Sequence, residues 1–219
     1  MLVGGAILPH PPIILPAYAA DRGAEVDQTI AAVQAACRWL ADELRPDRFV
    51  IASPHEGHGF TVPLHFIREA FAELPPHRRL LTAEPSYAAY LKLGEELRAE
   101  ETPTLERVAV IASGDCSHRL KQDGPYGFHP NGPKLDEAIL AGVQRGSAQA
   151  LLEIPPDLVR DGAECGLGSF IFALTATQPS AAEILSYQAP YGVGYLVAAF
   201  QAGAAGSPPP AEAPPQPPT

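Results

Sequence analysis

The stretch Leu2-Val3-Gly4-Gly5-Ala6-Ile7-Leu8-Pro9-His10-Pro11-Pro12 decides how this chain folds. Its uncharged first part, Leu2–Leu8, predicts a buried β-strand, and the prolines around His10 predict that the strand ends there. The result is a histidine directly after a buried strand, and the same pattern recurs further along the chain.

Two more apolar runs are followed by histidines. Residues 49–52 (Phe-Val-Ile-Ala) precede His55 and His58, and residues 107–112 precede His118. Open α/β sheets build their sites just beyond the carboxyl ends of their strands, so we expect these imidazoles to gather at one edge of a sheet. For any one of them taken alone, a hydrogen-bonded structural histidine is the ordinary alternative.

A carboxylate completes the set. Glu164 lies in Ala-Glu-Cys-Gly between small, uncharged neighbours, which predicts a buried group that needs a partner; a helix N-terminal glutamate is the alternative. Two histidines and one carboxylate on one face of a metal, with positions left open, suit non-haem Fe(II) oxygen chemistry. The same donors also suit catalytic zinc, so a Zn(II) hydrolase is a competing interpretation.

The segment Ser113-Gly114-Asp115-Cys116-Ser117-His118 allows a second kind of chemistry. Cys116 as a nucleophile with His118 as its base is one hypothesis, although no orienting third residue or oxyanion hole accompanies it. Asp115 capping a turn is the ordinary interpretation. The glycine pairs elsewhere lack the spacing of a dinucleotide or phosphate fingerprint, so no such cofactor is expected.

The composition of the chain argues against several classes of function. The 219 residues carry a formal net charge of -10 and no basic cluster, which argues against a nucleic-acid-binding surface. No apolar run approaches the roughly 18 residues of a membrane span, and the N-terminal run has no positive residue before it, so no signal peptide is expected. Three cysteines without CxxC spacing favour free thiols in a reducing cytoplasm.

Strand and helix patterns alternate along the chain and predict an α/β class protein: a single-domain α/β sandwich with a central, mostly parallel sheet flanked by helices. The expected domain covers residues 1–200, and the Pro- and Ala-rich residues 201–219 are expected to form a disordered tail. The predicted strands are 2–8, 49–52, 79–82, 108–112, 182–187 and 194–200. The predicted helices are 26–44, 64–74, 86–100, 134–145, 148–154 and 164–175.

Seven short motifs occur in an order that is characteristic of one family. They are Gly5-Ala6-Ile7-Leu8-Pro9-His10-Pro11-Pro12, Ser53-Pro54-His55, His58-Gly59 with Val62-Pro63-Leu64, Ala112-Ser113-Gly114-Asp115-Cys116-Ser117-His118, Gly124-Pro125-Tyr126-Gly127-Phe128, Ala163-Glu164-Cys165-Gly166 and Tyr191-Gly192-Val193-Gly194-Tyr195. Over residues 1–200 the chain resembles the class III extradiol ring-cleavage dioxygenases of the LigB-like superfamily. It is most similar to the Memo-like branch of the AmmeMemoRadiSam system, whose domain is often fused to an AMMECR-type domain.

The resemblance implies a role for each matching residue. It implies that His10, His55 and Glu164 bind Fe(II), with Zn(II) as the alternative metal. It implies that His118 acts as acid and base and that His58 contacts substrate or dioxygen. The implied reaction is the cleavage of a small catecholic ring with O2.

The chain also departs from the family pattern. Relatives carry a long segment between Ser-Pro-His and His-Gly that forms part of the pocket wall, whereas His55 and His58 are here three residues apart. We therefore expect an open pocket or one completed by a second subunit, in a homodimer or with a partner chain. A Memo-like metal-binding or redox module without ring cleavage is the alternative function.

Overall fold

The computed structural model describes residues 1–82 and 86–203. In these ranges a six-stranded sheet forms the centre of the molecule, in the order β3-β2-β4-β1-β6-β5. The strands are β1 (Leu2–Leu8), β2 (Arg48–Ser53), β3 (His77–Leu81), β4 (Val108–Ser113), β5 (Glu183–Gln188) and β6 (Tyr195–Gln201).

The sheet is mostly parallel, as the sequence predicts. β3, β2, β4 and β1 pair in parallel, and only β6 is antiparallel to its two neighbours, β1 and β5. β1 and β4 lie side by side in register, with Leu8 opposite Ser113. The segments after β1, β2 and β4 therefore leave the sheet at the same edge, which is the geometry that the histidine pattern required.

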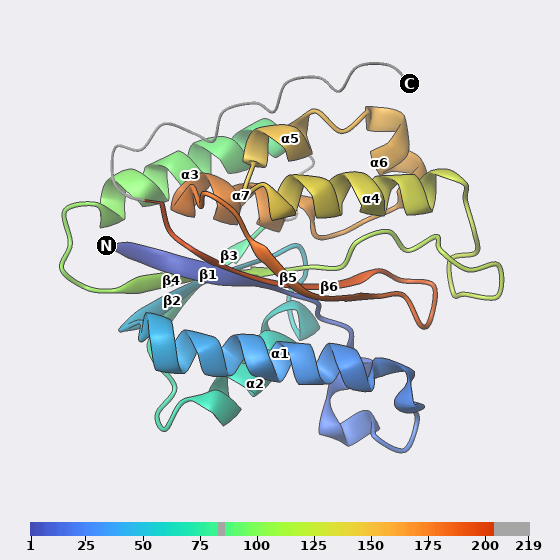
Figure 1. Cartoon of the computed structure of the whole chain (residues 1–219), viewed down its shortest axis with the longest axis horizontal. Helices are drawn as coiled ribbons and strands as arrows, with labels where there is room; N and C mark the ends of the chain where they lie inside the picture. Colours follow the sequence, from blue (N-terminus) through green and yellow to red (C-terminus); the bar gives the residue numbers. More distant parts are fainter. Residues whose placement is uncertain (83–85, 204–219) are drawn as a thin grey trace.

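Helices cover both faces of the sheet (Figure 1). One face carries α1 and α2, and the other carries α3 to α7. The helices are α1 (Asp27–Trp39), α2 (His58–Ala70), α3 (Tyr87–Glu101), α4 (Asn131–Gln144), α5 (Ala148–Leu152), α6 (Pro156–Gly162) and α7 (Leu167–Thr177). Short helical turns lie at η1 (Pro12–Ile14), η2 (Pro16–Tyr18), η3 (Ala24–Val26) and η4 (Leu40–Leu44). The α/β sandwich is confirmed.

The burial patterns of the helices follow from their positions against the sheet. All eleven residues of α7 are buried, because this helix packs between the sheet and α3. α1 instead shows the periodic burial of a helix with one solvent face, and it continues into the π-helical turn η4 before Arg45 ends it in a left-handed conformation. Both faces of the sheet thus bury their own apolar cluster.

Several boundaries differ from those that the sequence predicts, and one helix is not predicted. α2 begins at His58, six residues before the predicted start, because the helix accommodates Pro63 in its second turn. α6 is an additional helix, with Pro156 at its first turn. Gln201 completes β6, and the amides of Ala202 and Gly203 donate to main-chain carbonyls, so the domain continues through Gly203. The rest of the predicted tail, 204–219, lies outside the described residues.

No helix in the described ranges is both long enough and apolar enough to cross a membrane.

Candidate metal centre

Three histidines meet at the carboxyl edge of the sheet. His10 follows β1, His55 follows β2, and His58 is the first residue of α2. Their ring centroids are 5.3 Å apart for His10 and His55, 5.1 Å for His10 and His58, and 5.2 Å for His55 and His58. One ring nitrogen from each lies within 4.8 Å of the others, so a single metal ion could contact all three.

His118 lies beside this cluster rather than within it. Its ring stacks on Tyr126, with 4.9 Å between centroids and 29° between planes. Its main-chain N–H donates to the Gly162 carbonyl at 3.1 Å, which fixes the loop after β4. The sequence therefore correctly predicts that His10, His55, His58 and His118 gather at one edge of the sheet, whereas their roles stay predictions.

The imidazoles of His10, His55 and His118 are held in an environment that favours the neutral form. Burial, followed by the proximity of the other three histidines, lowers the pKa of His10 to about 3. Burial and His55 lower the pKa of His118 to about 4, and burial and His58 also lower that of His55. Neutral imidazoles carry the free lone pair that ligation and proton transfer both require.

His10 is oriented by a hydroxyl group. Ser113, the last residue of β4, is fully buried, and its Oγ lies 2.9 Å from Nδ1 of His10. The same hydroxyl donates to the Gly59 carbonyl at 2.6 Å. His10 is 2% exposed, so this contact replaces water at that nitrogen.

The start of α2 packs unusually closely against β2. A Cβ at Gly59 would lie 2.1 Å from Ser53 Oγ and 3.3 Å from His55 Cβ, so no larger residue fits there without displacement. Gly57 adopts a φ of 64°, which allows the sharp turn between His55 and the helix. These two glycines are the local reason that His55 and His58 can share a site although they are three residues apart.

Two further donors adjoin His10, and sequence reasoning did not assign them to the site. Asp115 Oδ2 and Cys165 Sγ lie 3.9 Å and 3.6 Å from His10 Nε2. His10, Asp115 and Cys165 form a second group whose ligand atoms lie within 4.8 Å of one another. Burial raises the pKa of Asp115 to about 7. A signal was present in the sequence, since both residues lie within motifs that also carry predicted site residues.

Glu164 is placed differently from the histidines. Its Oε1 accepts a hydrogen bond from the Tyr87 hydroxyl at 2.9 Å, and its Oε2 accepts the Leu167 N–H at 2.6 Å at the start of α7. Among the described residues it belongs to neither of the two groups of closely spaced ligand atoms. Its predicted role as a metal ligand stays a prediction, and the observed role is the helix N-terminal one.

The nucleophile hypothesis for Cys116 is wrong. The side chain is 0% exposed and packs in the apolar cluster of the α3-to-α7 face. Burial, together with nearby carboxylates, raises the pKa of its thiol well above the usual value, so the reactive thiolate is suppressed.

The comparisons with known proteins identify the family of the chain. The family profile described as "Catalytic LigB subunit of aromatic ring-opening dioxygenase" matches residues 57–200, well over half of the chain. The chain belongs to the LigB family. The match includes His58, His118 and Glu164, while His10 and His55 precede it.

Two proteins similar to this LigB-family chain are informative, one in sequence and one in fold. "Protein CA_C1420" of Clostridium acetobutylicum is 35% identical over 147 residues, which is 66% of this chain. The chain spans only 31% of the length of that relative. The crystal structure of the uncharacterized protein JW3007 from Escherichia coli K12 matches with a TM-score of 0.58 and 13% identity, over 92% of this chain and 100% of that one, and so supports the fold alone.

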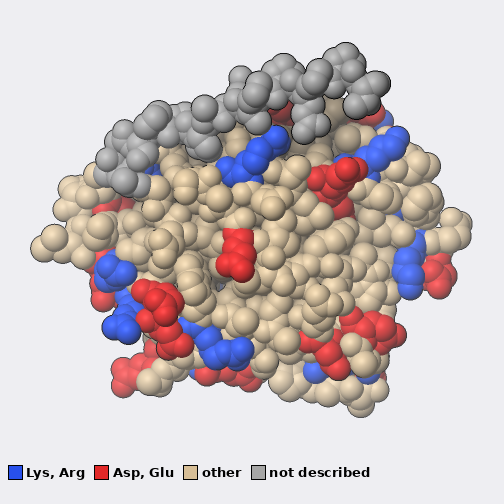
Figure 2. Space-filling model, in the orientation of Figure 1, with Lys and Arg blue, Asp and Glu red and all other residues tan. Residues whose placement is uncertain are grey.

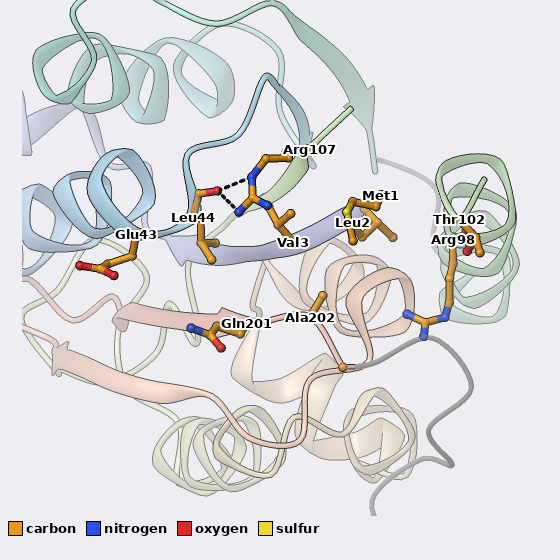
Figure 3. Close-up of a pocket in the computed structure, with 11 residues that line it drawn as sticks. Met1, Leu2, Val3, Glu43, Leu44, Arg98, Thr102, Arg107, Gln201 and Ala202 are labelled. Carbon is orange, nitrogen blue, oxygen red and sulfur yellow. Dashed lines mark hydrogen bonds between the residues drawn. The ribbon is translucent and has the colours of Figure 1, made fainter. Parts of the chain in front are cut away.

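The LigB-family chain also has a pocket away from the histidines. It has a volume of about 390 Å³ and lies at the opposite end of the sheet, between the start of β1 and the end of β6 (Figure 3). Arg107 donates to the Leu44 carbonyl through Nε at 3.1 Å and Nη2 at 2.7 Å, and Arg98 donates to two carbonyls at the end of α7. The guanidinium groups thus stabilise the main chain, and the histidine cluster remains the candidate site.

The charges on the face seen in Figure 2 give no second candidate site. On the face seen in Figure 2, acidic and basic side chains are interspersed and most of the surface is uncharged. A nucleic-acid surface requires clustered Lys and Arg, and this face shows no such cluster.

Proposed function

We propose that this chain is an Fe(II)-dependent extradiol dioxygenase that opens a small catecholic ring with O2. The observation that carries the proposal is the cluster of three histidines within 4.8 Å, with His118 beside it at the same edge of the sheet. Membership of the LigB family supports an enzyme of the dioxygenase type.

The donor set fits a first-row transition metal. His10, His55 and His58 would hold the ion through imidazole nitrogens, and Asp115 is the carboxylate nearest to His10 in the described groups. Imidazole and carboxylate ligands suit Fe(II), and also Zn(II). Bound iron would supply the redox chemistry that lets O2 react with an aromatic ring.

The chain's own residues supply the proton chemistry. His118 has its pKa held at about 4 by burial, so it is neutral at physiological pH and can take a proton from a catechol hydroxyl at a ring nitrogen. Tyr126 covers one face of His118 and limits the access of water to it. His58 is the exposed member of the histidine cluster, so a substrate that approaches from solvent would meet it first.

The deciding experiment is anaerobic reconstitution with Fe(II), followed by oxygen uptake against a panel of catechols. We expect uptake with yellow ring-fission product, and loss of at least about 100-fold in His118→Gln with iron still bound. His65→Gln is the matched control, because His65 lies on α2 and pairs with Glu69 at the surface. Full activity in His10→Ala, or in a His10→Ala/Glu164→Ala double variant, contradicts the proposal.

One observation favours the Memo-like alternative. Cys165 Sγ lies 3.6 Å from His10 Nε2, and a cysteine sulfur beside an imidazole suits a metal-binding or redox module. Stoichiometric metal binding without oxygen uptake for any catechol would select this function, and activity restored by Zn(II) alone would select a hydrolase. We also propose a homodimer or a partner subunit over the exposed His58, which sedimentation of the loaded protein tests.

A further inference from the structure

The side chain of Ser113 joins two parts of the site that are far apart in the sequence. Its Oγ lies 2.9 Å from His10 Nδ1 and 2.6 Å from the Gly59 carbonyl oxygen. A hydroxyl has one proton to donate, and the carbonyl can only accept. Ser113 therefore gives its proton to Gly59 and must accept one from His10, so that His10 carries its proton on Nδ1.

The Gly59 carbonyl can accept because of a proline one turn later. In an α-helix the carbonyl of residue 59 normally accepts the N–H of residue 63. Residue 63 is Pro63, which has no N–H, inside α2. The carbonyl is therefore left without its helical partner, and the buried Ser113 hydroxyl takes that place.

We propose that Ser113 and Pro63 are positioning residues that hold His10 in the Nδ1–H tautomer, with the lone pair of Nε2 directed into the histidine cluster. This inference rests on the proposed metal centre. Nε2 is the nitrogen that faces the other donors, since it lies 3.6 Å from Cys165 Sγ and 3.9 Å from Asp115 Oδ2. The opposite tautomer would direct an N–H into the cluster and prevent ligation.

The tautomer can be observed without metal or turnover. In the metal-free full chain, 15N chemical shifts distinguish a protonated from an unprotonated ring nitrogen, and His10→Gln assigns the signals. We expect His10 Nδ1 protonated and Nε2 unprotonated at pH 7. A protonated Nε2 in the unmodified chain overturns the inference, whatever the activity of the protein.

Two serine substitutions distinguish an effect on the orientation of His10 from a general loss of stability. We expect Ser113→Ala to weaken Zn(II) binding by about 10–100-fold in a chelator competition. Ser169→Ala is the matched control, because the Ser169 hydroxyl is equally buried and bonds to Thr82 at 2.8 Å. The control should lower the melting temperature like Ser113→Ala and leave Zn(II) affinity unchanged. Equal Zn(II) affinity in Ser113→Ala and the unmodified chain overturns the role of Ser113.

Pro63→Ala gives the sharpest test, because its two effects should have opposite signs. Alanine restores the helical N–H to Gly59, so the helix should gain stability and the melting temperature should hold or rise. The Ser113 hydroxyl then competes for its acceptor, and Zn(II) affinity should fall by about 3–10-fold as the share of the Nδ1–H tautomer falls. If Pro63→Ala changes neither the Zn(II) affinity nor the tautomer of His10, Pro63 has no positioning role. A chain that binds Zn(II) as expected but consumes no oxygen refutes the dioxygenase and leaves this inference standing.

Discussion

The two ends of the central sheet differ in whether their buried carboxylates have a cationic partner. At the amino end of β2, Arg48 contacts Glu101 and Glu106, and Glu101 is 0% exposed. At the carboxyl end, Asp115 and Asp136 are 6% and 1% exposed and form no ion pair with Lys or Arg in the described ranges. The amino end neutralises its carboxylate with a guanidinium, whereas the carboxyl end leaves polar groups available for protons or a metal.

Glu101 and Asp136 show this difference most directly. The Glu101 carboxylate contacts Arg48 and also accepts a hydrogen bond from Thr104. Within residues 1–82 and 86–203, the hydrogen-bond donors to Asp136 are both neutral: the Ser117 N–H at 2.7 Å and the Tyr187 hydroxyl. Burial raises the pKa of Asp136 to about 6 despite these bonds. At the amino end, an ion pair with Arg48 therefore stabilises the buried carboxylate. At the carboxyl end, no cation in the described part of the chain offsets the free-energy cost of burying the charged form of Asp136.

Breaking the amino-end pair should have the largest effect on stability. Arg48→Met leaves the Glu101 carboxylate buried without its cation, so we expect the free energy of unfolding to fall by about 3–5 kcal/mol. Zn(II) affinity at the histidine cluster should stay unchanged in the folded fraction. Urea unfolding and chelator competition measure the two quantities. Glu106→Gln is the control, because its side chain is half exposed and the loss should stay below about 1 kcal/mol. Equal losses in both variants would contradict the comparison.

The titration of Asp136 should have an intermediate effect on the free energy of unfolding. Its pKa is raised from 3.8 to about 6, so between these values the folded chain binds more protons than the unfolded chain. The contribution of this carboxyl group to stability is full below pH 3.8 and is lost as the pH rises through 6, by up to about 3 kcal/mol in total. Asp136→Asn lacks this titration. The stability of the unmodified chain relative to Asp136→Asn, from urea unfolding at several pH values, should fall by that amount between pH 4 and 7. Parallel curves would contradict the assignment.

The parts of the fold that the sequence predicts are those with strong local signals. The run Leu2–Leu8 and the prolines after it specify a strand and its end without help from the rest of the chain. α6 gave no such signal, because its seven residues are too few to show a period. The predicted start of α2 lies six residues after the observed one, and the tertiary contact of Ser113 with Gly59 shows how the helix tolerates Pro63.

The sequence predicts where the site lies in the fold, but it does not predict every residue that belongs to the site. Histidines after parallel strands meet because the topology brings strand ends together, and this needs no side-chain detail. Whether Cys165 or Glu164 faces His10 depends on the backbone turn between them. Cys165 lies 3.6 Å from His10 Nε2, while Glu164 is hydrogen bonded by Tyr87 and Leu167. A sequence shows that two neighbouring residues differ in chemistry, but not which of them points inward.

The smallest expected change in stability belongs to Tyr126, and it shows how the carboxyl end keeps its histidines neutral. Tyr126 is 58% exposed, so Tyr126→Ala should change the free energy of unfolding by only about 0.5 kcal/mol. The ring nevertheless covers His118, whose pKa is held at about 4 chiefly by burial. Removing the ring admits water, which stabilises the charged imidazolium, so the pKa of His118 should rise toward 6.5.

An NMR titration of the metal-free chain measures this rise, with His118→Gln as the assignment variant. Phe128→Ala is the matched control, since Phe128 is 46% exposed on the same loop and has no ring contact with His118 among the described residues. The control should leave the pKa near 4. If the pKa also stays near 4 in Tyr126→Ala, burial by the rest of the protein and the proximity of His55, rather than the aromatic cover, keep His118 neutral.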